Sequence, residues 1–120
     1  DSVIFARELK QHGCDFVDCS SGGNSPNRPP VGPGFPGYQL PFSEQVRNES
    51  DIPTIAVGML RDYNLAEEAI SNGKADLIAL GRGMLYDSRW AWHAAHELGG
   101  KASYPNQYAR SEPEKWPKAF

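Results

Sequence analysis

The chain has 120 residues, of which 39% are hydrophobic and 22% are charged, and its formal net charge is -3. That length suffices for one small domain with a hydrophobic core. The charge gives no reason to expect nucleic acid or a membrane surface as a partner. No apolar run approaches the roughly 20 residues that span a bilayer.

The first predicted elements are a helix, a strand and a long loop. Residues 2–12 have helical periodicity, with Phe5 and Leu9 one turn apart. Residues 15–19 predict a strand. Residues 20–40 are rich in Gly, Pro, Ser and Asn, a composition typical of a loop, and a loop of that length usually has a function.

A second helix and a second strand follow this loop. Pro41 occupies a favoured first-turn position, so the helix is predicted to begin there. Phe42 and Val46 are one turn apart and are expected on its buried side. Residues 53–58 predict the next strand, which ends in a glycine.

The third helix is predicted around Asn64, a residue type that often caps helices, with Glu67 in the capping-box position. Its buried side is expected to consist of Ala66, Ala69 and Ile70. Residues 76–80 predict a third strand. A last helix is predicted over residues 88–98, and the polar, proline-containing residues 101–120 are expected to form an irregular tail.

The two cysteines, Cys14 and Cys19, are expected on one strand, where they point to opposite faces and cannot form a disulfide. Two cysteines without a Cys-x-x-Cys motif also argue against a zinc site, so no metal is predicted. Free thiols are typical of a cytoplasmic protein. The chain opens at Asp1 rather than at a methionine, which we interpret as processing or as a fragment of a longer chain.

Strands that alternate with helices predict an α/β fold with a parallel sheet. Two architectures fit this order, a doubly wound open sheet and part of a (β/α)8 barrel. A complete barrel needs about 250 residues, so this chain could supply only part of one. Small residues and glycines follow each predicted strand, which places potential ligand groups at the carboxyl ends of the strands.

The third strand runs directly into Gly81-Arg82-Gly83. Glycines let backbone N–H groups come close to a ligand, and arginine adds a permanent charge with forked donors. This pattern predicts a site for a phosphate. The alternative interpretation is an ordinary turn with a surface arginine.

Six segments occur in the order found in one known family, and together they cover most of the chain. They are Asp18-Cys19-Ser20-Ser21-Gly22, Phe35-Pro36-Gly37-Tyr38-Gln39, Ala56-Val57-Gly58-Met59, Ala75-Asp76-Leu77-Ile78, Gly81-Arg82 and Gln107-Tyr108-Ala109-Arg110. The set resembles the C-terminal part of the Old Yellow Enzyme family of FMN oxidoreductases, in its thermophilic-like ene-reductase subclass. The resemblance implies a (β/α)8 TIM barrel with FMN at its mouth. Residues 1–100 would be its last three βα units and residues 101–120 its tail.

The resemblance also implies roles for individual residues. Gly81 and Arg82 match positions that bind the FMN phosphate. Gly58 matches a backbone position that approaches the same phosphate, and Ser20 matches a serine close by. The catalytic residues of the family match no position here, because they lie on earlier strands. We expect Gly58 to accept no side chain, because its backbone would lie against the ligand.

In the family, the arginine of the Gln-Tyr-x-Arg segment reaches into the active site of a neighbouring subunit. Tyr108 and Arg110 match that segment, which implies a homo-oligomer. Trp90 matches a position where some relatives have an aromatic residue near the flavin. His93 and His96 are expected to lie on the outside of the last helix.

The resemblance therefore implies an FMN-dependent oxidoreductase that uses NADH or NADPH to reduce activated C=C bonds, such as those of enones. The N-terminal portion of the same barrel would supply the remaining strands. Two alternatives stay open. One is a phosphate-binding (β/α)8 enzyme without flavin, and the other is an isolated fragment without activity.

Overall fold

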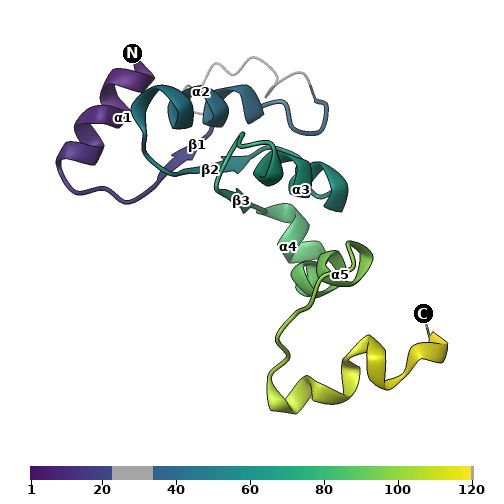
Figure 1. Ribbon diagram of the computed structural model, residues 1–120. Coiled ribbons are helices and arrows are strands. Elements are labelled where there is room, and N and C mark those ends of the chain that lie inside the picture. The colour runs from purple at the N-terminus through teal and green to yellow at the C-terminus, as the bar shows by residue number, and fades with distance from the viewer. Residues whose placement is uncertain (23–33, 120) are drawn as a thin grey trace.

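A computed structural model describes residues 1–22 and 34–119. The elements are shown in Figure 1: α1 (Ser2–Gln11), β1 (Val17–Cys19), α2 (Leu40–Ser50), β2 (Thr54–Val57), α3 (Tyr63–Ser71), β3 (Leu77–Ala79), α4 (Arg82–Tyr86), α5 (Trp90–Glu97), and the 3-10 helices η1 (Asn106–Ser111), η2 (Pro113–Lys115) and η3 (Pro117–Ala119).

The three strands form one parallel sheet in the order β1-β2-β3. Asp18 of β1, Ile55 of β2 and Leu77 of β3 lie side by side in register. The predicted α/β order and the parallel sheet are confirmed, although each strand is shorter than predicted.

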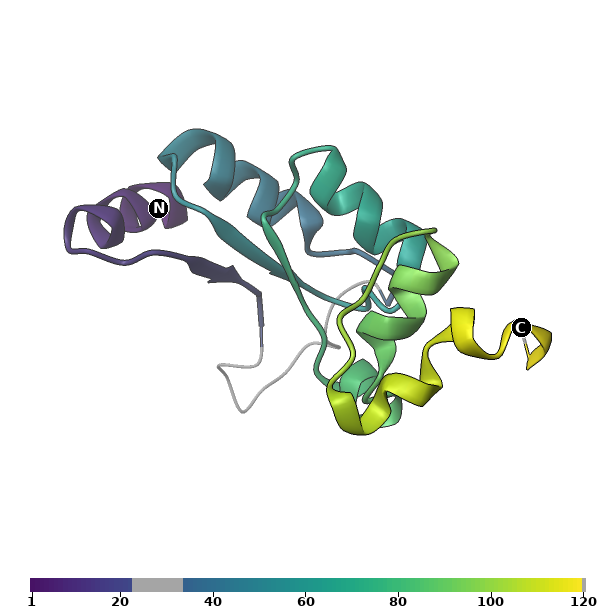
Figure 2. The same ribbon diagram turned by 60° about the horizontal axis from the view of Figure 1, so that its bottom comes forward.

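Helices α1, α2 and α3 lie on one face of the sheet (Figure 2). Thr54 and Ala56 of β2 are fully buried beneath them. The alternating residues point to the opposite face, where Leu77 is 47% exposed and Asp18 is also exposed. In this chain, that second face of a parallel sheet has no covering layer among the described residues.

The core consists of two clusters on the helix-covered face. One joins α2, β2 and α3 and contains Leu40, Ala56, Leu60, Ala69 and Ala75. The other joins α1, β1 and α2 and contains Ala6, Cys19, Val46 and Ile52. Many of these side chains are alanines, so the helices pack closely against the strands.

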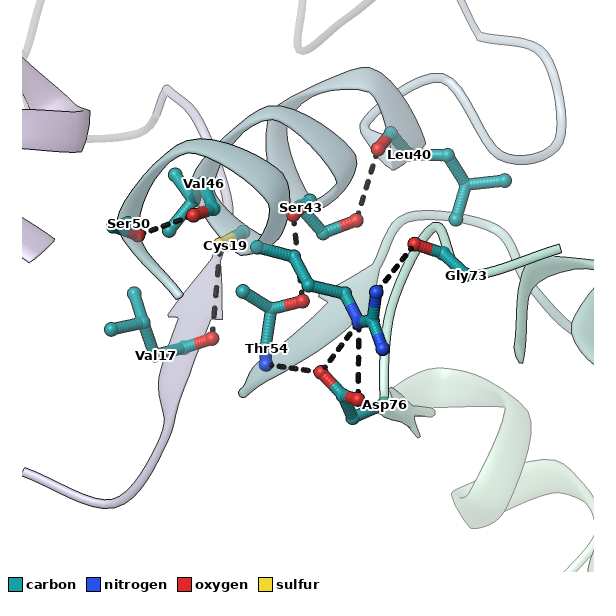
Figure 3. A network of polar contacts seen from close by, with 10 residues as sticks. Val17, Cys19, Leu40, Ser43, Val46, Ser50, Thr54, Gly73 and Asp76 are labelled. Carbon is teal, nitrogen blue, oxygen red and sulfur yellow. Dashed lines mark hydrogen bonds and ion pairs between the residues drawn. The ribbon is translucent and has the colours of Figure 1, made fainter. Parts of the chain in front are cut away.

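The predicted buried side of α2 is partly wrong. Val46 is buried, but Phe42 is 45% exposed. The helix begins at Leu40, one residue before Pro41, and its buried residues are Leu40, Ser43, Val46 and Ser50. This stripe includes two serines, whose hydroxyls donate to backbone carbonyls of Leu40 and Val46 (Figure 3). Phe42 was predicted to be buried because it is apolar, but two serines that bond to the helix backbone occupy the buried side instead.

Similar corrections apply to α1 and α3. Phe5 is exposed, and Ala6 is the buried residue of α1. The N-cap of α3 is Asp62 rather than Asn64, because Asp62 is extended and its carboxylate accepts a hydrogen bond from Leu65 N (2.9 Å). Ala66 and Ala69 are buried as predicted, whereas Ile70 is exposed.

A polar network ties α2 to the sheet at the amino ends of the strands (Figure 3). Asp76 accepts hydrogen bonds from Arg47 Nε (3.0 and 3.1 Å) and from the backbone N–H of Thr54 (2.9 Å). Arg47 Nη1 also donates to the carbonyl of Gly73 (3.3 Å). One carboxylate thus connects a helix to two neighbouring strands.

The last predicted helix, over residues 88–98, is confirmed as α5, and a further short helix, α4, precedes it. Residues 82–86 form α4 directly after the third strand, and α5 begins at Trp90. Asp87 separates them with an extended backbone, and its carboxylate accepts from Arg89 N (3.0 Å). The tail is also more regular than predicted, because η1, η2 and η3 follow Pro105, Glu112 and Trp116.

Both cysteines are free, as predicted. Cys14 lies before β1 rather than in it, while Cys19 is buried and desolvation raises the pKa of its thiol. Among the helices of residues 1–22 and 34–119, none is long and apolar enough to cross a membrane.

Candidate functional site

A cleft lies at the carboxyl ends of β2 and β3, with a volume of about 860 Å³. Binding sites for small molecules commonly have volumes of about 300–1,000 Å³. Its lining residues are Pro36, Tyr38, Gln39, Val57, Gly58, Met59, Leu60, Arg61, Asp62, Tyr63, Ala79, Leu80, Gly81, Arg82, Gly83 and Tyr86. Three of the residues predicted to bind a cofactor, Gly58, Gly81 and Arg82, are therefore brought together.

Gly58 is restricted by the protein itself. Its φ is 126°, a conformation that residues with side chains rarely adopt. A Cβ placed there would lie 3.1 Å from Gln39 Nε2 and 3.2 Å from Tyr38 Cε1. Its carbonyl accepts a hydrogen bond from Gly37 N (2.9 Å). A side chain at this position is thus disfavoured even before a ligand is considered.

Gln39 is a structural residue of the cleft that the sequence interpretation missed. Its side-chain amide donates to the carbonyl of Val57 (3.1 Å). Its Oε1 accepts from both the backbone N–H (2.6 Å) and the hydroxyl (2.9 Å) of Ser21. Gln39 is 4% exposed, so a buried amide joins the ends of β1 and β2. Its position in the Phe35–Gln39 segment was the available signal.

Gly81 and Arg82 lie at the junction between β3 and α4. A Cβ on Gly81 would meet nothing within 4 Å, so this backbone is open to solvent. Arg82 is exposed, and no residue in the described part of the chain forms an ion pair or hydrogen bond with its guanidinium. Arg82 is thus a permanent cation at the edge of the cleft with no partner among residues 1–22 and 34–119.

Arg61 is a second cation of the cleft, and it was also missed. Its guanidinium lies 4.9 Å from the centre of the Tyr86 ring. Asp62 is the acid among the lining residues, and its carboxylate is engaged in capping α3. Two arginines against one capping carboxylate suit this cleft to an anionic group.

Trp90 supports the wall of the cleft rather than lining it. Its indole N–H donates to the carbonyl of Arg61 (2.7 Å), and its ring packs at 5.4 Å from that of Tyr63. Ser20 is exposed after β1 and is not among the lining residues. Residues 23–33 of the predicted loop lie outside the described residues.

Tyr108 and Arg110 lie in η1, away from the cleft lining. Tyr108 is 46% exposed, and its ring contacts the ring of Trp92, with 5.7 Å between the ring centres. Arg110 is exposed and forms no hydrogen bond or ion pair with the described residues. In this single chain, the tail therefore packs on its own α5.

His93 and His96 lie on α5, as predicted. His93 Nδ1 is 2.8 Å from Asp87 Oδ2, and this hydrogen bond lowers the pKa of the Asp87 carboxyl. Within the described ranges, no group of three or more His, Cys, Asp or Glu side chains could hold a metal ion.

Comparisons with known proteins identify the family of the chain. Residues 2–100 match the model of the NADH:flavin oxidoreductase / NADH oxidase family. The chain is 46% identical over 110 residues to an NADPH dehydrogenase of Geobacillus thermodenitrificans and 44% identical over 110 residues to one of Bacillus subtilis. Each alignment covers 92% of this chain and 32% of the relative. The chain thus spans about a third of the length of these relatives.

Proposed function

Because the chain belongs to the NADH:flavin oxidoreductase / NADH oxidase family, we propose that it is the C-terminal third of an FMN-dependent NAD(P)H oxidoreductase. In this proposal, the three βα units are the last three of a (β/α)8 barrel, called the complete enzyme below. The N-terminal portion of the barrel supplies the other strands. The uncovered face of the sheet, with Ile55 and Leu77, becomes part of the barrel interior, which supports the proposal.

The observation that carries this function is Arg82, which lies at the edge of a cleft formed by strand ends and has no partner among the described residues. FMN ends in a phosphate dianion, which suits a guanidinium and nearby backbone N–H donors. We assign the phosphate to Arg82, Gly81 and Gly58. Gly81 leaves its backbone open, and Gly58 has no side chain to block the approach. Ser20 is proposed to lie near the same group from the end of β1.

The chemistry that FMN supplies when bound is hydride transfer between NADH or NADPH and an activated C=C bond, such as that of an enone. The residues of this chain bind and orient the cofactor. Gln39 holds the end of β2 through the carbonyl of Val57, and Trp90 holds the segment before α3 through the carbonyl of Arg61. The groups that would activate the substrate belong to the rest of the barrel.

The tail is proposed to act on a second copy of the protein. Arg110 is exposed and has no partner among the described residues, and η1, η2 and η3 bury none of their residues. Arginine and tyrosine are enriched where proteins meet. We place Arg110, with Tyr108 beside it, at the flavin pocket of the adjoining subunit in a homo-oligomer.

The visible spectrum of the purified complete enzyme tests the function. We expect flavin absorption that NADH or NADPH bleaches in the absence of oxygen, and that an α,β-unsaturated ketone restores. A colourless protein that binds inorganic phosphate but not FMN would instead favour a barrel enzyme without flavin. Bleaching without recovery on addition of the ketone would retain the flavin and reject the enone class of substrate.

A further inference from the structure

The tail is joined to α5 through a cluster of aromatic rings. Trp92 of α5 packs against Tyr104, with 4.5 Å between ring centres, and against Tyr108, with 5.7 Å. The yellow tail in Figures 1 and 2 extends away from the sheet beyond this point. The direction in which the chain leaves α5 therefore depends on how these rings are held.

Arg89 lies against two of these rings at once. Its guanidinium carbon is 5.5 Å from the centre of the Trp92 ring and 5.0 Å from the centre of the Tyr108 ring. Both distances are within the roughly 6 Å over which a cation is attracted to an aromatic face. One ring belongs to the helix and the other to the tail, so the guanidinium bridges the two segments.

The backbone of Arg89 is held by hydrogen bonds, and its guanidinium forms no ion pair in the described part of the chain. Its N–H donates to Asp87 Oδ1 (3.0 Å), and its carbonyl accepts from Trp92 N (2.9 Å). No carboxylate of residues 1–22 or 34–119 forms an ion pair with it. The guanidinium is thus held at the start of α5, where the rings are its partners.

The tail has few means of its own to keep a fixed direction. Its 3-10 helices have poorer hydrogen-bond geometry than an α-helix and contain no buried residue. Trp116 donates to the carbonyl of Ser111 (3.2 Å), which is a contact within the tail. Tyr104 and Tyr108 therefore join the start of the tail to α5, and Glu112, Pro113 and Glu114 then line a hollow beside the end of that helix.

We infer that Arg89 is a positioning residue, which bridges Trp92 and Tyr108 so that the tail presents Arg110 to a second copy of this chain. Arg110 follows Tyr108 by two residues in the same helix η1, so fixing the tyrosine fixes the arginine. This inference rests on the proposed function for the target of Arg110. The bridge itself depends only on the contacts within one chain.

Trypsin digestion of the complete enzyme tests the bridge without reference to activity. Loss of two cation–π contacts in Arg89→Ala should raise the rate of cleavage after Lys101 by about 5- to 30-fold, because cleavage follows the population of the opened tail. Lys118→Ala is the control, since the Lys118 side chain is exposed and forms no hydrogen bond or ion pair with the described residues. Cleavage of Arg89→Ala at the wild-type rate would overturn the inference.

Steady-state kinetics then test the positioning. Arg89→Ala should raise the KM for the oxidising substrate as Arg110→Ala does, with kcat and flavin content unchanged, and the double variant should equal Arg110→Ala. Arg89→Lys should recover part of the loss, because the charge remains while the planar stacking is lost. A raised KM in Arg110→Ala but not in Arg89→Ala would refute the positioning role. Faster cleavage with KM unchanged in both variants would support the bridge and refute the proposed target of Arg110.

Discussion

At the scale of single residues, Gly58 and Gly81 both face the cleft but have opposite physical requirements. Gly58 has a φ of 126° and close neighbours in Tyr38 and Gln39. Gly81 has a φ of -74° and open space where a Cβ would lie. A side chain at residue 58 would therefore strain the protein itself, whereas a side chain at residue 81 would interfere only with a bound ligand.

We predict that Gly58→Ala destabilises the complete enzyme by about 1–3 kcal/mol, the cost of a strained backbone conformation. Gly81→Ala should leave stability nearly unchanged, because alanine adopts its φ without strain. The urea midpoints of the two variants, measured without added FMN, provide the comparison. Equal midpoints would show that the backbone at residue 58 relaxes without cost.

At the residue scale, the sequence predicted which strand-end residues meet, while their binding roles stay a prediction. Gly58, Gly81 and Arg82 lie at one cleft, as strand-end glycines and an arginine predicted. Gln39 and Arg61 were missed because neither type signals its role locally. A buried amide that joins two strand ends is defined by partners 18 residues away on either side.

At the scale of elements, the network around Asp76 connects α2, β2 and β3. Thr54 is fully buried, and its N–H has Asp76 Oδ2 as its partner. The ion pair with Arg47 is partly exposed, with side-chain exposures of 36% and 30%, so solvent screens part of its contribution. The hydrogen bond to the buried N–H is therefore the larger contribution.

We predict that Asp76→Ala destabilises the protein by about 1–3 kcal/mol, because a buried donor loses its acceptor. Asp51→Asn is the matched control, since Asp51 pairs with Lys10 at the surface and its side chain is 98% exposed. The control should change stability much less, because solvent screens an exposed ion pair. Thermal or urea unfolding of both variants measures the difference, and equal effects would contradict a structural role for the network.

The order of elements was predictable from the sequence. The buried side of each helix and the residues at which elements end were less predictable. The parallel three-stranded sheet followed from the alternation of helices and strands. Phe42 and Ile70 were assigned to buried faces because they are apolar, yet serines and alanines occupy those faces. The break at Asp87 depends on contacts of its carboxylate with Arg89 and His93, which no periodicity reveals.

At the scale of the whole molecule, two surfaces of the chain lack a cover among the described residues. One is the sheet face with Ile55 and Leu77, and the other is the tail beyond Tyr108. The family resemblance seen in the sequence is confirmed by the family match over residues 2–100. In the function proposed above, the remaining barrel strands would cover the first surface, and a neighbouring subunit the second.

We predict that the complete enzyme is a homo-oligomer and that Arg110→Ala raises the apparent KM for the oxidising substrate more than it changes flavin content. Removing the guanidinium should weaken closure of the pocket over the substrate, while the flavin remains held from within its own barrel. Light scattering on the purified enzyme measures the oligomeric state. A strictly monomeric enzyme with full activity would contradict the prediction.

The central claim, that Arg82 holds the phosphate of FMN at the carboxyl ends of the strands, is tested most directly by comparing FMN with riboflavin. A charge-assisted contact contributes about 1.5–3 kcal/mol. Arg82→Ala in the complete enzyme should therefore weaken FMN binding by about 10- to 150-fold. Riboflavin has no phosphate, so its affinity should stay unchanged, and Arg7→Ala, which removes the same charge from α1, should alter neither. Unchanged FMN affinity in Arg82→Ala, or an equal loss for both flavins, would contradict the claim.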